Sequence, residues 1–206
     1  MGMRIHKKWD FLIEQSGALV LLLTIYLLGG LAGCLFVALP NGAGAKELSG
    51  YLADYLTLAG GGRLPRELWP VLWNQLRYPL SVLVLSLTGF GIVGVPALIG
   101  IRGFFFAFPV ACFCKTFGGS GLFPAFILFG LPALLWTPAL FILGVSGFLA
   151  AQRQFRRSAG EGGGNLYFAV PYWYRIGLCF GLSLTAGLLE FWVVPVLLRA
   201  VAHVVL

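Results

Sequence analysis

The sequence predicts an all-α integral membrane protein with about five transmembrane helices. The first observation is composition: of 206 residues, 59% are hydrophobic and only 10% are charged, whereas a soluble domain carries about 25% charged residues. The second is a series of apolar runs, several of which reach the roughly 20 residues that a membrane-spanning helix needs. The third is charge: the net +7 comes from short basic flanks beside these runs, which indicates membrane orientation rather than nucleic-acid binding.

The apolar runs divide the chain into alternating membrane and aqueous segments. The predicted transmembrane helices are residues 17–39, 78–101, 103–117, 122–151 and 174–198. The predicted aqueous segments are a cytoplasmic N-terminus at 1–16, an extracytoplasmic loop at 40–77, a basic cytoplasmic loop at 152–173 and a C-terminal tail at 199–206.

The short run 103–117 decides the number of spans. If it returned to the face it entered from, Arg153, Arg156 and Arg157 would lie outside the cell, against the tendency of short cytoplasmic loops to be basic. If it crosses, five spans result, with the N-terminus cytoplasmic and the C-terminus extracytoplasmic. The basic residues then expected in the cytoplasm are Arg4, Lys7, Lys8, Arg102, Arg153, Arg156, Arg157 and Arg175.

The fourth predicted span contains three prolines, Pro124, Pro132 and Pro138. Proline removes a backbone donor and disturbs the preceding turn of a helix. In a membrane such breaks persist where protein or water satisfies the freed carbonyl groups. We therefore expect this span to be kinked or broken.

Pairs of glycines one turn apart occur in the first and last spans, as Gly29 with Gly33 and Gly177 with Gly181. Small residues at this spacing allow two helices to approach closely. The sequence leaves open whether these pairs pack within the chain or in a homo-oligomer.

The outer loop is predicted to contain an amphipathic helix over residues 46–60, with Tyr51 and Tyr55 on its apolar face. Trp69 and Trp73 follow it. Aromatic side chains at this level are typical interfacial anchors. A docking surface for an extracytoplasmic partner is the alternative interpretation.

No enzymatic, metal or cofactor motif is convincing in this sequence. A GxxxxGK[ST] phosphate-binding loop is missing, and the four cysteines form no CxxC pair. Residues 118–121 read GGSG, which resembles the nucleophile motif of intramembrane rhomboid proteases, but Ser120 would need His203 as its base. The expectation is a non-enzymatic protein without cofactors, with an intramembrane serine protease as a remote alternative.

Glu190 is the main chemical anomaly, because it lies within the apolar stretch GLLEFWVVP. A charge near the bilayer centre costs roughly 2.5–3.5 kcal/mol on insertion scales, so lipid exposure is not expected. Its predicted partners are Lys115 or carbonyl groups freed by the prolines of the fourth span. The carboxyl group could fasten the helices, serve assembly with a partner, or couple to ions or protons.

The whole pattern resembles the stage II sporulation protein M family. The resemblance rests on an N-terminal span followed by an outer loop, the sequence NQLRY at 74–78, and the glycine-rich LTGFGIVGVPALIGIRGFFFAF at 87–108. It rests also on a glutamate shortly before a proline in the last helix, here Glu190 and Pro195. The proline-rich fourth span departs from the family pattern.

The resemblance implies a scaffold in the mother-cell membrane of a sporulating bacterium. Family members hold two peptidoglycan hydrolases, stage II sporulation proteins D and P, during engulfment. Asn74, Glu190 and Pro195 would then be assembly or structural residues. The alternative is a permease or transporter-associated membrane subunit, which requires more polar residues along a route than this sequence offers.

Overall fold

The computed structural model describes residues 2–39, 50–51, 54, 58, 67–158, 160 and 170–205, with side chains described for 15–39, 50–51, 54, 58, 67–158, 160 and 173–197. Regular structure in this described part is helical throughout, without a strand. The elements are α1 (Gly2–Ala38), α3 (Leu68–Ser86), α4 (Gly91–Phe117), η1 (Gly118–Gly121), α5 (Leu122–Ala125), η2 (Phe126–Gly130), α6 (Leu131–Ser158) and α7 (Val170–Val205).

Long apolar helices support the predicted class of an all-α membrane protein. Three helical stretches are long and apolar enough to cross a membrane: Gln15–Ala38, Gly91–Ser158 and Trp173–Leu197. The second of these folds back on itself at η1, where Gly118 has a φ of +63° that favours glycine. Length and composition therefore support an all-α, membrane-embedded protein.

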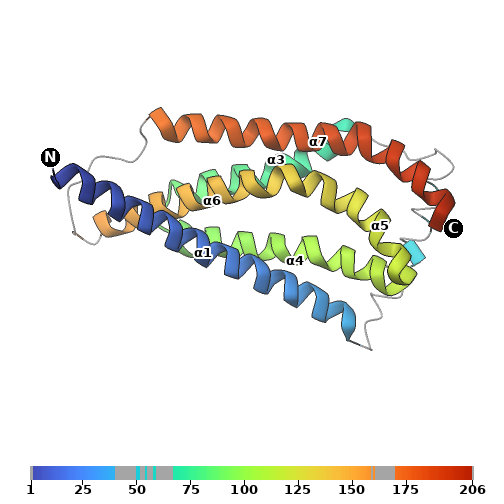
Figure 1. Cartoon of the computed structure of the whole chain (residues 1–206). Helices are drawn as coiled ribbons and strands as arrows, with labels where there is room; N and C mark the ends of the chain where they lie inside the picture. The colour runs from blue at the N-terminus through green and yellow to red at the C-terminus, as the bar shows by residue number, and fades with distance from the viewer. Residues whose placement is uncertain are drawn as a thin grey trace.

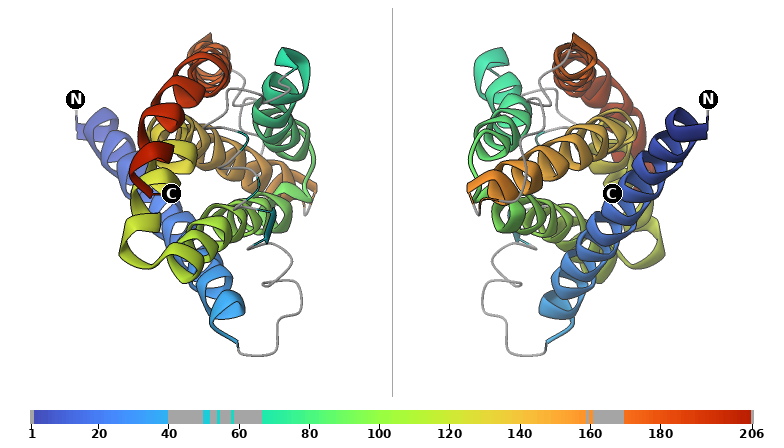
Figure 2. Two further views of the ribbon diagram at one scale, coloured as in Figure 1. Left: turned by 90° about the vertical axis from the view of Figure 1, so that its right-hand side faces the viewer. Right: turned by 90° about the vertical axis from the view of Figure 1, so that its left-hand side faces the viewer.

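The helices form an elongated bundle, and α1 begins and α7 ends at opposite ends of its long axis (Figure 1). Figure 2 views the bundle along that axis. The α6 helix contacts α1, α3, α4 and α7. Its buried side chains include Leu143 and Leu149, each 1% exposed. The core is therefore built around α6, and the other helices cover it.

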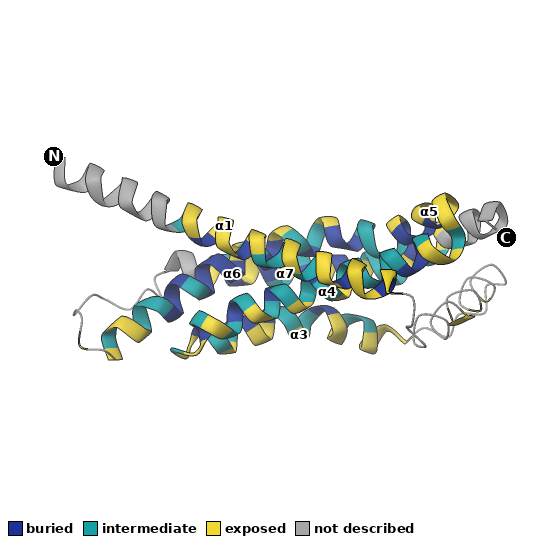
Figure 3. Ribbon diagram, turned by 90° about the horizontal axis from the view of Figure 1, so that it is seen from below, coloured by how far each residue is buried: buried dark blue, intermediate teal, exposed yellow. Residues whose placement is uncertain are grey.

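Figure 3 shows exposed positions along the outward faces of the helices, and many of the exposed side chains are large and apolar. On α1, Leu27, Leu31 and Leu35 are between 57% and 66% exposed. An exposed surface of this kind is unfavourable in water, because burial of apolar surface is the main favourable term in folding. It is compatible with lipid as the surrounding solvent.

The α1 and α4 helices run parallel and touch along a line of glycines, which we call the glycine seam (Gly29, Gly33, Gly100 and Gly103). A Cβ atom on Gly29 would collide with the Gly100 carbonyl oxygen, and one on Gly103 would collide with the Tyr26 carbonyl oxygen. A Cβ on Gly33 would lie 2.8 Å from the Phe104 carbonyl oxygen. The two helices can approach this closely because these positions lack side chains.

The predicted boundary between spans at Arg102 is wrong. Residues 78–101 do not form one helix: α3 ends at Ser86, a turn follows, and α4 runs without a break from Gly91 through Arg102 to Phe117. The turn is tight, since a Cβ on Gly91 would lie 2.7 Å from Ala151 Cβ and would collide with the Leu85 carbonyl oxygen. Hydropathy does not reveal this turn, because Leu87, Thr88, Gly89 and Phe90 include two strongly apolar side chains and no charged one, so the apolar run continues through it.

Several predicted aqueous segments are also helical in part. The α3 helix begins at Leu68, so residues 68–77 belong to it and not to an irregular loop. Helix α1 starts at Gly2, and α7 covers 170–205, which includes most of the predicted tail at 199–206. Most of the predicted amphipathic helix at 46–60 lies outside the described residues.

The fourth predicted span is irregular, as its prolines indicate. Between Pro124 and Pro132 the helix widens into the π-helical segment η2 (Phe126–Gly130) before α6 begins. Proline at 132 cannot donate to the ordinary i−4 carbonyl, and π segments of this kind often mark functional sites. The widened turn places Leu128 and Phe129 beside the polar residues described next.

Candidate functional site

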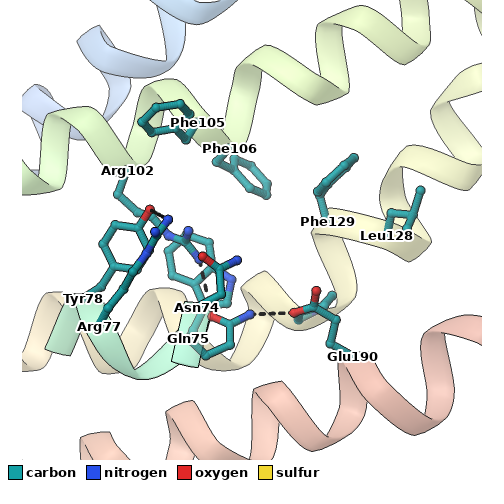
Figure 4. Close-up of a pocket in the computed structure, with 12 residues that line it drawn as sticks. Asn74, Gln75, Arg77, Tyr78, Arg102, Phe105, Phe106, Leu128, Phe129 and Glu190 are labelled. Atoms are coloured by element: carbon teal, nitrogen blue, oxygen red, sulfur yellow. Dashed lines mark hydrogen bonds between the residues drawn. The ribbon is translucent and has the colours of Figure 1, made fainter. Parts of the chain in front are cut away.

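Polar side chains from three helices meet inside the bundle (Figure 4). Gln75 on α3 is only 6% exposed. Its Nε2 donates a hydrogen bond of 2.8 Å to Oε2 of Glu190 on α7, and its Oε1 accepts one of 3.4 Å from Nη2 of Arg102 on α4. The single amide thereby links a carboxyl group and a guanidinium group that are far apart in the sequence. We call Gln75, Arg102 and Glu190 the polar junction.

Arg102 is held between two aromatic rings. Its Cζ lies 4.1 Å from the ring centroid of Tyr78 on α3 and 4.1 Å from that of Trp136 on α6. A guanidinium group stacks well on aromatic faces, because it is planar and weakly hydrated. These contacts stabilise a charge that the bilayer would otherwise exclude, and they bring a fourth helix into the junction.

A glycine on α7 allows the hydrogen bond from Gln75 to Glu190 to form. Gly187 precedes Glu190 by one helical turn and faces α3: a Cβ there would lie 2.9 Å from Leu72 Cδ2 and 3.6 Å from Gln75 Cγ. A larger residue would press against the Leu72 side chain and crowd Gln75. Close approach of α3 and α7 is therefore part of what positions the junction.

The junction borders a cavity of about 250 Å³. Asn74 and Arg77 lie at its exposed rim, while Gln75 and Trp136 are buried. The remaining wall is mostly apolar and comes from α4, η2 and α6. The cavity thus combines two guanidinium groups, one carboxyl group and several aromatic rings, a lining suited to a small polar group attached to an apolar body.

Lys115, one of the two predicted partners of Glu190, bonds elsewhere. Lys115 Nζ donates a 2.5 Å hydrogen bond to the Val37 carbonyl oxygen at the end of α1. The carboxyl group of Glu190 instead accepts from Gln75. Distance along the helices explains the difference, since Lys115 lies in the last turn of α4, about 20 Å along the axis from Arg102.

The other predicted residues occupy several places. Asn74 lines the cavity, and Pro195 lies within α7, five residues after Glu190. Trp69 and Trp73, at the start of α3, are 73% and 53% exposed. Tyr51 is 68% exposed. Tyr55 lies outside the described residues.

The two predicted glycine pairs behave differently. Gly29 and Gly33 lie in the glycine seam against α4, whereas a Cβ on Gly177 or Gly181 would meet nothing within 4 Å. The pair on α7 makes no close helix contact with the described part of the chain. It is open to lipid or to a second molecule.

Ser120, the nucleophile of the remote protease interpretation, donates a 2.7 Å hydrogen bond from its Oγ to the Phe117 carbonyl oxygen within the same turn. The side chain of His203 lies outside those described. The described geometry therefore gives this alternative no additional support.

Sequence patterns do not single out Arg102, Gln75, Tyr78, Arg77 or Trp136 as site residues. Arg102 was assigned to a cytoplasmic flank because a charge commonly marks the end of a span. One signal indicates otherwise: Arg102 stands alone between IGI and GFFF, without the polar neighbours of a typical loop. Gln75 and Tyr78 lie in the NQLRY segment, but nothing in the sequence indicates which of its residues faces inward.

Comparison of the chain with models of protein families, with curated proteins and with solved structures gives no match.

Proposed function

We propose that the protein is a non-enzymatic membrane scaffold of the sporulation engulfment machinery, similar to stage II sporulation protein M. In this proposal it resides in the mother-cell membrane and holds peptidoglycan hydrolases, similar to stage II sporulation proteins D and P, at the outer face. One observation carries the proposal. Two of the segments on which the resemblance rests, 74–78 and 190–195, are joined by the 2.8 Å hydrogen bond from Gln75 to Glu190.

This contact supports a structural role for both segments. In lipid there is little hydrophobic force between helices, so packing and polar links hold them in place. A link among α3, α4 and α7 fixes the direction in which the start of α3 leaves the membrane. A scaffold needs such rigidity, because its partner must find the same surface on every molecule.

The proposed topology has five passes, made by α1, α3, α4, α6 and α7, with the N-terminus in the cytoplasm. The turn between α3 and α4 packs beside Phe155 near the end of α6, where a Cβ atom on Gly89 would lie 3.9 Å from Phe155 Cδ2. Arg153, Arg156 and Arg157 belong to that end of the bundle, which suits a cytoplasmic location. Cysteine labelling should find position 160 protected from an impermeant maleimide and position 44 labelled; labelling of both from outside would contradict five passes.

The proposed docking surface is the exposed aromatic start of α3. Replacing both Trp69 and Trp73 with alanine removes large apolar side chains of the type that often dominates interfaces. The hydrolases should then no longer co-purify with the scaffold from sporulating cells, while its amount in the membrane stays normal. The matched control is Trp173→Ala, an exposed tryptophan (60%) near the start of α7, at the other end of the bundle.

Two outcomes separate the possibilities. Loss of the hydrolases in the Trp69/Trp73 double variant but not in Trp173→Ala supports the scaffold and its docking surface. Normal recovery from the double variant, together with normal engulfment in a strain lacking this protein, would refute the scaffold function itself.

A second candidate, a permease-like subunit, is favoured by the polar cavity beside the junction. A transport route must continue from this cavity to the opposite end of the bundle, where Ser146 and Arg175 form a 3.4 Å contact. In a cysteine-free background, a Ser146→Cys variant should react with a small soluble thiol reagent if such a route exists. An Asn74→Cys variant at the cavity rim is the positive control.

A further inference from the structure

Two tryptophans at the start of α3 indicate where the cavity beside the polar junction lies relative to the membrane surface. Trp69 and Trp73 are exposed on the first turns of α3, and tryptophan at a helix end typically marks the membrane–water interface. Arg77 follows Trp73 by one turn, about 6 Å along the helix axis. The rim of the cavity is therefore about one turn below the predicted interface.

The charges at the cavity favour an anion. Two guanidinium groups, of Arg77 and Arg102, face a single carboxyl group, and the latter accepts a hydrogen bond from Gln75. Arg102 is stacked between two rings and bonded to Gln75. Among the described residues, Arg77 donates one hydrogen bond, of 3.0 Å, to Tyr78 Oη. A guanidinium group has five N–H donors, so Arg77 retains donors for an incoming oxyanion.

The apolar part of the wall indicates what the anion is attached to. Phe105, which lines the cavity from α4, is 56% exposed, and Ile101 on the preceding turn is 53% exposed. The cavity is thus continuous with the outward apolar face of α4. A molecule with its head at Arg77 could leave its tail along this face, in the surrounding lipid.

The volume is sufficient for a headgroup. At ~30 Å³ per water molecule, the cavity of about 250 Å³ has room for about eight waters. A phosphodiester group has five heavy atoms and fits without displacing a helix. Arginine recognises phosphate well, because its planar fork forms two parallel hydrogen bonds to the oxygens.

We infer that this cavity binds the phosphate of an anionic lipid headgroup, held by Arg77 and Asn74 at the rim, with the lipid tail along Phe105. The inference is independent of the scaffold function. The shared chemistry is a phosphate oxyanion, and the source is a lipid rather than free phosphate.

The test is direct titration of full-length protein in neutral detergent with fluorescent phosphatidylglycerol. Arg77→Gln should weaken binding at least about tenfold, because it removes a charge-assisted hydrogen bond. Arg156→Gln is the matched control: it removes the same charge from an exposed position near the end of α6, and affinity should not change. Glu190→Gln should tighten binding, because it removes the one like charge at the site.

The outcomes decide the inference. Weaker binding in Arg77→Gln only, with tighter binding in Glu190→Gln, supports it. Equal weakening in Arg77→Gln and Arg156→Gln overturns it, since general attraction to a chain of net charge +7 would then explain the binding. Inorganic phosphate is tested as a competitor. If it displaces the lipid at a comparable concentration, and only when Arg77 is present, the ligand is free phosphate and not a lipid headgroup.

Discussion

The glycine seam and the polar junction hold helices together in opposite ways. Along the seam, α1 and α4 approach until the backbone of one helix touches the backbone of the other, at Gly29, Gly33 and Gly103. At the junction, Gln75, Arg102 and Glu190 reach across the space between α3, α4 and α7. The seam depends on absent side chains, while the junction depends on long ones. Substitutions should therefore damage them by different mechanisms and to different extents.

The largest effect is expected at the seam. Gly103→Val places a branched side chain against the Tyr26 carbonyl, where the existing approach already excludes a Cβ. Overpacking typically costs about 1–3 kcal/mol. Because the clash is between a Cβ atom and backbone atoms, which cannot rotate away, the free energy of unfolding should fall by about 3 kcal/mol or more. Thermal unfolding in detergent measures it. The control is Gly177→Val on α7, which meets nothing within 4 Å and should unfold as wild type; equal stability of both variants would contradict the seam.

An intermediate effect is expected at the junction. Glu190→Leu leaves the buried Gln75 amide without its acceptor, at a cost of between about 0.6 and 3 kcal/mol. Glu190→Gln keeps an acceptor of the same length and should remain near wild type in thermal stability and in the recovery of partner complexes. Thr185→Val, exposed on the same helix, is the control.

The junction result also separates shape from charge. If Glu190→Gln unfolds as readily as Glu190→Leu, the carboxylate charge is required. Attraction between Glu190 and Arg102 would then dominate over the hydrogen bond from Gln75. If Arg102→Gln lowered thermal stability by the same amount, the attraction between Arg102 and Glu190 would be identified as the essential link.

The smallest effect is expected at Lys115, where a long polar side chain of α4 reaches the backbone of α1. Lys115 donates to the Val37 carbonyl, one of the last four carbonyls of α1, which have no partner within the helix. A cation there also interacts favourably with the helix C-terminus, by about 0.3–1 kcal/mol. Lys115→Met should lower the unfolding temperature slightly, and Lys115→Arg should restore it. If Lys115→Met lowered the unfolding temperature as much as Gly103→Val, the glycine seam would depend on this one hydrogen bond.

Much of the fold could be predicted from hydropathy, because membrane helices are long and apolar. The class, the first and last spans and the irregular fourth span follow from 17–39, 174–198 and the prolines. The turn between α3 and α4 could not be located, because Leu87, Thr88, Gly89 and Phe90 carry no charge and include two strongly apolar side chains, so the apolar run is not interrupted. A single charged residue is equally ambiguous, because it can mark the end of a span or a buried polar site. Arg102 belongs to the second kind, since two aromatic rings and Gln75 accommodate it inside the bundle.

The candidate site was only half predictable for a similar reason. A carboxyl group at Glu190 within an apolar run is a local anomaly, and it led to the correct helix. Its partner is 115 residues away in the sequence, and no local pattern distinguishes Gln75 from Asn74 as the inward-facing amide. Pairing of this kind depends on how α3 and α7 are rotated, which Gly187 and the neighbouring packing decide.

The modest apolarity of α3 has a consequence for how the protein is made. This helix has 19 residues, contains Asn74, Gln75 and Arg77, and is not among the stretches apolar enough to cross a membrane unaided. Its polar groups find their partners on α4 and α7, which leave the ribosome later. We therefore expect the translocon to retain α3 until α4 has been synthesised and to release the two as a hairpin. In a cysteine-free chain truncated after residue 90, a Val84→Cys variant on α3 should react with a membrane-impermeant maleimide, whereas in one truncated after residue 121 it should be protected.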